Sequence, residues 1–249
     1  MKLKVLIITG LLLCAYVTSQ AGESASAPWG YKGALGPEYW GTLSKGYRHC
    51  SKGKNQSPIN ISWAAELELD KIEFHYNSTP VFLINNGHTI QLNHASGSYI
   101  VIAGDRFDLL QLHFHTLSEH QVKGRHYPME MHLVHQDRNK RLAVIGVFFK
   151  AGRQNKSLKK LWEKLPTRKG ASVSGDAVLN VTSLLPDQRS YFHYMGSLTT
   201  PPCSEGVRWL VLKNPVQVSK KQLNAFKKLF PANYRPVMPL NSRNIYSMN

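Results

Sequence analysis

The chain has 249 residues, enough for one large domain or two small ones, and the absence of internal repeats, low-complexity runs and Gly/Ser-rich linkers favours one. Its 31 lysines and arginines against 15 acidic residues give a formal net charge of +16, which is compatible with binding to nucleic acids or anionic membranes. Because the basic residues are scattered or merely paired, without a stripe of aromatic side chains beside them, the sequence argues against nucleic-acid binding and favours a basic, soluble surface.

The N-terminal residues have the pattern of a secretory signal peptide. Lys2 and Lys4 give a charged start, residues 5–17 are mostly apolar, and Ser19-Gln20-Ala21 fits a small-residue cleavage site. The apolar run is too short to span a membrane. We therefore predict that residues 1–21 are removed, with cleavage after Ala27 as a second choice, and that residues 22–249 form one exported domain.

Most of the remaining chain has the composition of β-strands. Short runs rich in Val, Ile, Phe and Tyr are separated by Asn-Gly, Ser-Gly and similar turn signals. In chain order, strands are predicted over residues 72–76, 81–84, 89–92, 99–102, 109–116, 129–135, 142–150, 191–194 and 208–212.

Two segments are predicted as helices. Apolar residues recur at helical spacing over residues 158–165, and Pro166 ends this first helix. Ser219 and Gln222 have the spacing of a capping box, and an apolar stripe follows them before Pro231 ends the second helix. We interpret both stripes as core contacts, so the sequence predicts a mainly β protein with few helices.

Three histidines are spaced as ligands of a catalytic metal. His113 and His115 lie on one predicted strand, where alternate residues point to the same face, about 6.6 Å apart. Lys123-Gly124 is a turn signal that can fold the strand carrying His132 back alongside the first. Three imidazoles on one sheet face form the ligand set of a zinc site whose fourth position is open.

Two oxygen-bearing side chains support this interpretation. Gln111 comes two residues before His113, and Glu130 comes two residues before His132, so each shares a face with its histidine. A zinc-bound imidazole normally donates its second N–H to such an oxygen, which fixes its tautomer and orientation. The competing interpretation is a polar strand face in contact with solvent. The apolar neighbours of these histidines indicate a buried sheet instead, where unpaired imidazoles would be costly.

The three histidines belong to a longer series of short motifs that runs from about Trp29 to Ile245. The motifs are Trp29-Gly30-Tyr31, Gln56-Ser57-Pro58-Ile59-Asn60, Asn85-Asn86-Gly87-His88, His113-Phe114-His115, Ser118-Glu119-His120, Glu130-Met131-His132-Leu133-Val134-His135, Leu198-Thr199-Thr200-Pro201-Pro202 and Asn233-Tyr234-Arg235-Pro236. In order and spacing they resemble the motifs of the α-class carbonic anhydrases. The resemblance implies a single mainly β domain with one large, mostly antiparallel twisted central sheet and a few short peripheral helices.

The resemblance also implies an activity: the reversible hydration of carbon dioxide to bicarbonate and a proton, by attack of zinc-bound hydroxide. Zn²⁺ is the implied cofactor. The residues that would bind it, or would hold its ligands in place, are His113, His115 and His132, with Gln111, Glu130 and Asn233 behind them.

By the same resemblance, Thr199 would orient the hydroxide, provided that its own hydroxyl proton is committed to Glu119. On local evidence alone Thr199 would be an ordinary turn residue and Glu119 a surface acid. The residues implied to contact carbon dioxide or bicarbonate are Thr199, Thr200, Val134, Val144, Leu198, Val207 and Trp209. Without the resemblance the apolar ones would be read as core.

His88 is the implied proton shuttle, because an unperturbed imidazole has a pKa near 6.5 and can exchange protons at neutral pH. On local evidence its segment is a hairpin turn with an exposed histidine. Tyr31, Asn86 and Gln91 are the implied partners that order a water chain between His88 and the metal. The remaining histidines are predicted to be structural or surface residues: His49, His75, His94, His120, His126, His135 and His193.

Cysteine usage agrees with export. Cys14 would leave with the signal peptide, and the mature chain would keep Cys50 and Cys203. Two cysteines in an exported protein are expected to pair. Because Cys203 directly follows Thr199-Thr200-Pro201-Pro202, the bridge would brace the loop that carries Thr199.

The destination of the exported protein and its catalytic competence each have an alternative. The short segment 116–118 between His115 and Glu119 resembles bacterial members and favours a periplasmic enzyme, whereas the sequons at Asn77 and Asn180 leave a secreted eukaryotic protein open. The alternative function is a non-catalytic carbonic anhydrase-like binding module. A small-molecule substrate is expected, with no nucleic acid and no membrane span, and the sequence does not choose between monomer and dimer.

Overall fold

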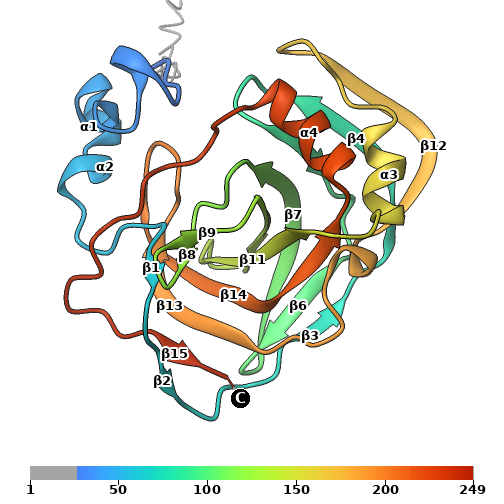
Figure 1. The fold of residues 1–249 in the computed structure, drawn as a ribbon. Helices are drawn as coiled ribbons and strands as arrows, with labels where there is room; N and C mark the ends of the chain where they lie inside the picture. Colours follow the sequence, from blue (N-terminus) through green and yellow to red (C-terminus); the bar gives the residue numbers. More distant parts are fainter. Residues whose placement is uncertain (1–26, 249) are drawn as a thin grey trace, which may run out of the picture.

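A twelve-stranded β-sheet forms the centre of the computed structural model, which describes residues 27–248 (Figure 1). The predicted signal peptide lies outside these residues. The strands of this sheet are β2 (Ala65–Glu66), β3 (Glu73–His75), β4 (Ser78–Asn85), β5 (Ile90–Asn93), β6 (Tyr99–Ile102), β7 (Asp105–His115), β10 (Met129–Gln136), β11 (Leu142–Ala151), β12 (Ser172–Asn180), β13 (Tyr191–Ser197), β14 (Glu205–Val218) and β15 (Tyr246–Ser247).

The main path of this sheet runs β12-β4-β5-β7-β10-β11-β14-β13-β15-β2, and β6 pairs with both β7 and β3. Within it only the β11–β14 and β15–β2 pairs are parallel, so the predicted mostly antiparallel sheet is confirmed. A second, small sheet contains β1 (Asn60–Ile61), β8 (Gln121–Val122) and β9 (Arg125–His126).

The helices are short and lie around the sheet, as predicted (Figure 1). They are α1 (Trp40–Leu43), α2 (His49–Lys52), α3 (Lys156–Trp162) and α4 (Lys220–Leu229), together with the 3₁₀ turns η1 (Gly33–Leu35), η2 (Lys45–Tyr47) and η3 (Val181–Leu184). Among the described residues, none of the helices has the length and apolarity needed to cross a bilayer.

The central strand β10 contributes side chains to both faces of the sheet. Seven of its eight residues are buried, including the polar residues Glu130, His132 and His135, which therefore need partners inside the protein. Met131 and Leu133 point into the larger hydrophobic core, which α3 and α4 cover with Leu158, Leu161 and Phe226. The alternate residues, among them His132 and Val134, face the other side of the sheet, where a smaller apolar cluster lies.

Both predicted helices are confirmed, but α3 ends at Trp162, four residues before Pro166, so Pro166 is not its stop signal. The end of α4 is as expected, because Pro231 directly follows its C-cap Phe230. In α4 the backbone N–H of Gln222 donates to Oγ of Ser219 at 3.2 Å, and the backbone N–H of Ser219 donates to Oε1 of Gln222 at 3.1 Å. This is the predicted capping box. In α3 the side chain of Asn155 caps the first turn by accepting from the backbone N–H of Leu158 at 2.9 Å, a cap that the sequence interpretation did not include.

The structure differs from the prediction at one long strand and one turn. Strand β12 was not predicted, because Gly175 and Asp176 interrupt its pattern where its pairing with β4 shifts register. Lys123-Gly124 does form a turn, with positive φ at both residues, but this turn closes the small β8–β9 hairpin. The strands carrying the histidines, β7 and β10, still pair antiparallel, with this hairpin between them in sequence.

The predicted Cys50–Cys203 disulfide is present. Both cysteines are buried, in a cluster with Trp40 and Tyr47 that Trp29 also contacts. The bridge therefore fastens the N-terminal segment to the loop between β13 and β14, across 153 residues of sequence.

Replacing both cysteines with serine is expected to lower the free energy of unfolding by about 2–5 kcal/mol, because the bridge closes a very long loop in the unfolded chain. Guanidinium unfolding of the mature protein measures this loss, and reduction of the unmodified protein should reproduce it. Mass spectrometry after alkylation should find no free thiol before reduction. Two alkylated cysteines in unreduced protein would contradict the bridge.

Candidate metal centre

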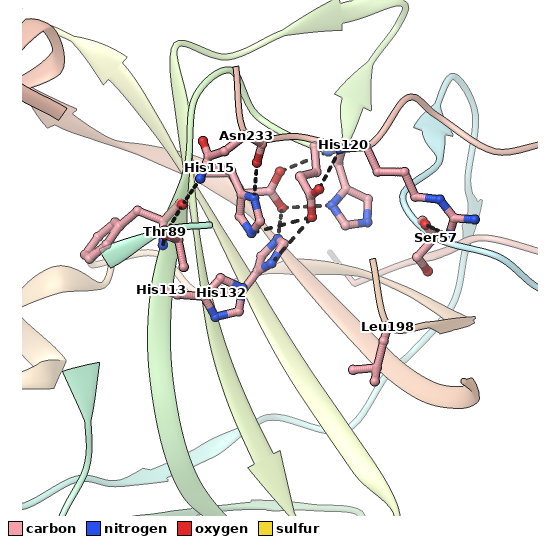
Figure 2. Close-up of polar contacts among 12 residues, drawn as sticks. Ser57, Thr89, His113, His115, His120, His132, Leu198 and Asn233 are labelled. Carbon is pink, nitrogen blue, oxygen red and sulfur yellow. Dashed lines mark hydrogen bonds and ion pairs between the residues drawn. The ribbon is translucent and has the colours of Figure 1, made fainter. Parts of the chain in front are cut away.

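The structure brings three histidine side chains together on one face of the sheet (Figure 2). His113 and His115 come from β7, and His132 comes from the neighbouring antiparallel strand β10, where it pairs directly with His113. One ring nitrogen of each histidine lies within 4.8 Å of one ring nitrogen of each of the others. The alternation of side chains along β7 and the register of the pair produce this arrangement.

The second ring nitrogen of each histidine is held by an oxygen that can only accept a hydrogen bond. The three pairs are His113 Nδ1 with Oε1 of Gln111 at 2.9 Å, His115 Nδ1 with the carbonyl oxygen of Asn233 at 2.7 Å, and His132 Nε2 with Oε1 of Glu130 at 3.0 Å. Each held nitrogen must therefore carry its proton, which leaves the facing nitrogen with a free lone pair.

Glu130 is itself held in place by two hydrogen bonds from His120. Its Oε1 accepts from Nδ1 of His120 at 2.8 Å and its Oε2 accepts from the backbone N–H of His120 at 2.9 Å. Burial alone would raise the pKa of Glu130, but His120 and His132 hold it well below its ordinary value. The carboxylate therefore stays charged inside the protein, and His120 occupies a structural position beside it, since its Nε2 also lies 2.7 Å from the hydroxyl of Tyr194.

Two buried atoms without a hydrogen-bond partner indicate that this cluster fits a metal ion. Nε2 of His115 and Oε2 of Glu119 have none among the described residues, and they lie 3.5 Å apart. Oε2 of Glu119 also lies 3.8 Å from Nδ1 of His132. Burial lowers the pKa of His113 and His115, which favours the neutral form that binds metals. Neutral imidazole nitrogens converging beside a carboxylate fit a divalent cation, and a set of three imidazoles suits zinc.

The loop between β13 and β14 carries Thr199, and its next residue, Thr200, lines the same cavity as His113 and His115. Thr199 is buried, and the loop around it is closed by hydrogen bonds from Leu198 N to the Ser204 carbonyl and from Cys203 N to the Thr200 carbonyl, both at 2.9 Å. The expected hydrogen bond from Thr199 to Glu119 is not among those of the described residues. Instead, Oε1 of Glu119 accepts from the backbone N–H of Arg235 at 2.8 Å, and Oε2 faces the imidazoles.

A cavity of about 110 Å³ connects the histidines with the predicted shuttle residue. Its walls contain the expected water-network residues and several others: Trp29, Tyr31, Asn86, His88, Thr89, Gln91, Gln111, His113, His115 and Thr200. Burial, and then the charge of Glu119, raise the pKa of Tyr31 well above its ordinary value, so its hydroxyl stays protonated. Two larger surface hollows, of about 650 and 690 Å³, contain none of these residues.

His88 is half-buried at the outer end of this cavity and is stacked on an aromatic ring. The rings of His88 and Trp29 are 3.7 Å apart between centroids and nearly parallel, at 8°. Burial and then the charge of Lys169 lower the pKa of His88, so its imidazole is neutral at neutral pH. The sequence analysis assigned no role to Trp29 beyond its motif. Its position two residues before Tyr31, a member of the expected water network, was the available signal.

Comparison with known proteins agrees with this geometry. A model of the eukaryotic-type carbonic anhydrase family matches residues 35–249. A carbonic anhydrase from a Nostoc species is 41% identical over 98% of this chain and 94% of its own length, and one from Neisseria gonorrhoeae is 43% identical over 94% and 93%. The solved α-carbonic anhydrase of Thermovibrio ammonificans, in complex with sulfanilamide, has a TM-score of 0.87 and 48% identity over 88% of this chain and 99% of its own.

The chain belongs to the α-class carbonic anhydrase family. The large sheet with few short helices is the fold of this family, so the fold implied by the resemblance is confirmed. The apolar residues that the resemblance implied to contact substrate lie together in this carbonic anhydrase, in the smaller apolar cluster on the histidine side of the sheet: Val134, Val144, Val207 and Trp209, with Leu198 packed against them. The ring of Trp209 lies 4.9 Å from that of His132.

Asn233 connects the segment that carries His88 to strand β7 of this carbonic anhydrase, and Figure 2 shows its contact with His115. Its Nδ2 donates to the carbonyl oxygens of His88 at 3.0 Å and of Phe114 at 2.9 Å, while its Oδ1 accepts from the backbone N–H of Thr116 at 2.8 Å. With the contact between its own carbonyl and His115, the single buried residue fixes both segments. The sequence indicated Asn233 as a supporting partner but not this double attachment.

The sequence analysis missed two other residues that hold segments of the site in place. Thr89 attaches the turn that carries His88 to β7, because its Oγ1 donates to the carbonyl of Phe114 at 2.6 Å and accepts from the N–H of Phe114 at 3.2 Å. The buried guanidinium of Arg235 donates to the carbonyls of Cys50 and Ser57, each at 2.8 Å. Both residues lie in or beside recognised motifs, but their partners are distant in sequence and no local pattern indicates them.

Proposed function

We propose that this carbonic anhydrase catalyses the reversible hydration of carbon dioxide to bicarbonate and a proton, with zinc bound by His113, His115 and His132. The observation that carries the proposal is the convergence of three imidazole nitrogens whose partner nitrogens are all held by acceptor oxygens. When bound, zinc lowers the pKa of a water ligand from its very high value in bulk water to about 7, an effect for which carbonic anhydrase is itself the reference case.

The protein positions the reactants. Gln111, Glu130 and Asn233 fix the imidazole orientations, so the metal ligands need little rearrangement on binding. Thr199 is proposed to orient the nucleophile through its hydroxyl, with Glu119 as the acceptor of the hydroxyl proton. In the structure Oε2 of Glu119 has no hydrogen-bond partner, so it has a free position for that proton.

The apolar cluster beside His132 is proposed to hold carbon dioxide, which is uncharged and gains nothing from polar partners. Val134, Val207 and Trp209 are almost fully buried there, and Thr200 is the polar residue where the neighbouring cavity meets this side. Bicarbonate, the charged product, has fewer favourable contacts with such a surface than with water, which favours its release.

The proton is proposed to leave along the cavity lined by Tyr31, Asn86 and Gln91 to His88. Asn86 holds the turn by accepting from the backbone N–H of His88 and of Thr89, each at 2.9 Å, and its Nδ2 donates to Oε1 of Gln91 at 3.3 Å. Because the pKa of His88 is lowered, its neutral imidazole is available to accept a proton at pH 7.

Replacing His88 with alanine is expected to lower kcat by about tenfold or more in a dilute buffer that does not transfer protons, while kcat/KM and zinc content stay nearly unchanged. Added imidazole buffer should restore much of the lost rate, because it supplies the relay from solution. The matched control is His75→Ala, which removes an exposed histidine outside the cavity and should have no effect. Failure of imidazole to rescue the variant, or an equal fall in kcat/KM, would reject the shuttle role.

The experiment that tests the proposed function is stopped-flow carbon dioxide hydration by the mature protein, with metal analysis before and after a strong chelator. We expect one zinc per chain, and activity that disappears with the metal and returns when zinc is restored. A folded, zinc-free protein without activity would support the alternative, a non-catalytic binding module. The presence of all three histidines with free nitrogens favours the enzyme.

The cellular setting is likewise a proposal. A buried disulfide between the cysteines of the described chain is typical of proteins that fold in an oxidising compartment, which agrees with an exported protein. The similarity to bacterial relatives favours the periplasm, with secretion as the alternative.

A further inference from the structure

The lysines that are scattered in the sequence come together on two adjacent helices. Nε1 of Trp162 in α3 donates to the carbonyl of Gln222 in α4 at 2.9 Å, and Nε2 of Gln222 donates to the carbonyl of Asn155 at 2.7 Å. The rings of Trp162 and Phe226 are stacked, 5.8 Å apart. These contacts hold α3 and α4 side by side over the larger core, as Figure 1 shows.

Basic residues dominate the surface of this helix pair and of the segments that adjoin it, although Asp187 lines a surface hollow together with Arg153 and Lys156. Residues 153–169 and 219–230 contain eleven lysines and arginines against one acid, Glu163, and that acid is paired with Lys159 at 3.4 Å. All eleven are exposed. We call these residues the basic face: Arg153, Lys156, Lys159, Lys160, Lys164, Arg168, Lys169, Lys220, Lys221, Lys227 and Lys228. Elsewhere, arginines such as Arg106 and Arg141 are paired with aspartates.

We propose that the basic face docks this protein peripherally on an anionic phospholipid bilayer. Nine of its eleven basic residues are lysines, which are compact point charges on flexible stems and suit a surface of many similar phosphates rather than one shaped ligand. The helices already bury their apolar sides in the core, so the contact would be electrostatic, without insertion. The attraction should therefore fall steeply as salt is added.

The side chains of the face argue against nucleic acid as the partner. Single-strand binding needs exposed aromatic rings on which bases stack, and the aromatic residues of these two segments are turned inward: Phe226 and Phe230 are buried, and Trp162 is partly buried against the core. Neither helix projects from the molecule to enter a groove, because both lie flat against the core.

The basic face ends beside the shuttle turn. The backbone N–H of Gly170 donates to the carbonyl of Asn85 at 2.7 Å, and the N–H of Asn85 donates to the carbonyl of Ala171 at 2.9 Å. The side chain of Lys169 covers Gly87, where a Cβ would meet its Cδ at 2.7 Å. Docking would thus bring the rim of the proton path close to the lipid headgroups.

The test measures co-sedimentation of the mature, zinc-loaded protein with vesicles of phosphatidylcholine alone or with 30% phosphatidylglycerol added. The face variant carries Lys220→Gln, Lys221→Gln, Lys227→Gln and Lys228→Gln. The control variant removes the same charge from exposed lysines elsewhere: Lys45→Gln, Lys52→Gln, Lys54→Gln and Lys71→Gln. Circular dichroism and thermal unfolding verify that both variants are folded, and neither set touches the proposed site.

We expect binding only to the anionic vesicles, release by 0.5 M NaCl, and a loss of apparent partitioning of about tenfold or more in the face variant, against a small loss in the control. Absence of binding to anionic vesicles at 0.1 M NaCl would overturn the proposal, as would equal losses in the two variants. Tighter binding to duplex DNA at the same salt, with the same dependence on the α4 lysines, would assign the face to nucleic acid instead. Because binding is the readout, these outcomes do not depend on the proposed catalytic function.

Discussion

Replacing His132 with alanine is expected to abolish tight zinc binding and carbon dioxide hydration together. The substitution removes one of three converging nitrogens and leaves the buried carboxylate of Glu130 without one of its two histidine partners. Loss of a supporting partner alone typically costs about 10- to 100-fold in metal affinity, so loss of a ligand should exceed that range. Zinc analysis after dialysis, with stopped-flow assays on the same samples, measures both effects.

A matched control is available three residues along the same strand. His135 is also buried, but its Nε2 lies 2.8 Å from the hydroxyl of Tyr76, away from the cluster, and its pKa is lowered to about 3 chiefly by burial. His135→Gln should therefore retain one zinc per chain, even if it lowers stability. Full zinc occupancy in His132→Ala would show that His132 is not a ligand.

Thr199→Ala is expected to lower kcat/KM by about 100-fold in every buffer, with zinc content unchanged. The proposed role of Thr199 is to orient the nucleophile, and loss of orientation at the reacting atoms costs on this order. The activity lost in this variant belongs to the chemical step and not to proton transfer. Imidazole should therefore not restore the rate, in contrast to His88→Ala.

Thr199→Ser provides the control, because it keeps the hydroxyl and removes only a methyl group from the loop closed by Leu198 and Ser204. It should retain most of the activity. A large loss in the serine variant equal to that in the alanine variant would assign the effect to packing of the loop. Glu119→Gln should resemble Thr199→Ala if Glu119 accepts the hydroxyl proton, and its activity should be normal if it does not.

The parts of the fold and site that could be predicted from the sequence depend on short-range regularities. Alternation along β7 places His113 and His115 on one face, and the two-residue offsets of Gln111 and Glu130 place their oxygens beside the rings. The capping box of α4 is equally local. Strand β12 was not predicted because its own sequence is a poor strand pattern. In the structure it pairs with β4 along one edge only.

The contacts that could not be predicted join residues far apart in the chain. Nothing near Asn233 indicates that its amide contacts the carbonyl of His88, 145 residues away. The same holds for Arg235 and the carbonyl of Cys50, separated by 185 residues. For Glu119, the resemblance gave its identity as a site residue, but its present contact with the N–H of Arg235 depends on how two distant loops meet.

The double attachment of Asn233 has a mechanical consequence. Because one amide holds the carbonyls of both His88 and Phe114, the turn and the strand must shift as one rigid body when the sheet flexes. The backbone of His88 is then held at a fixed distance from strand β7, while the ring of His88 can still rotate about its own side-chain bonds. In the proposed proton transfer, His88 would thus be a mobile side chain on a fixed backbone.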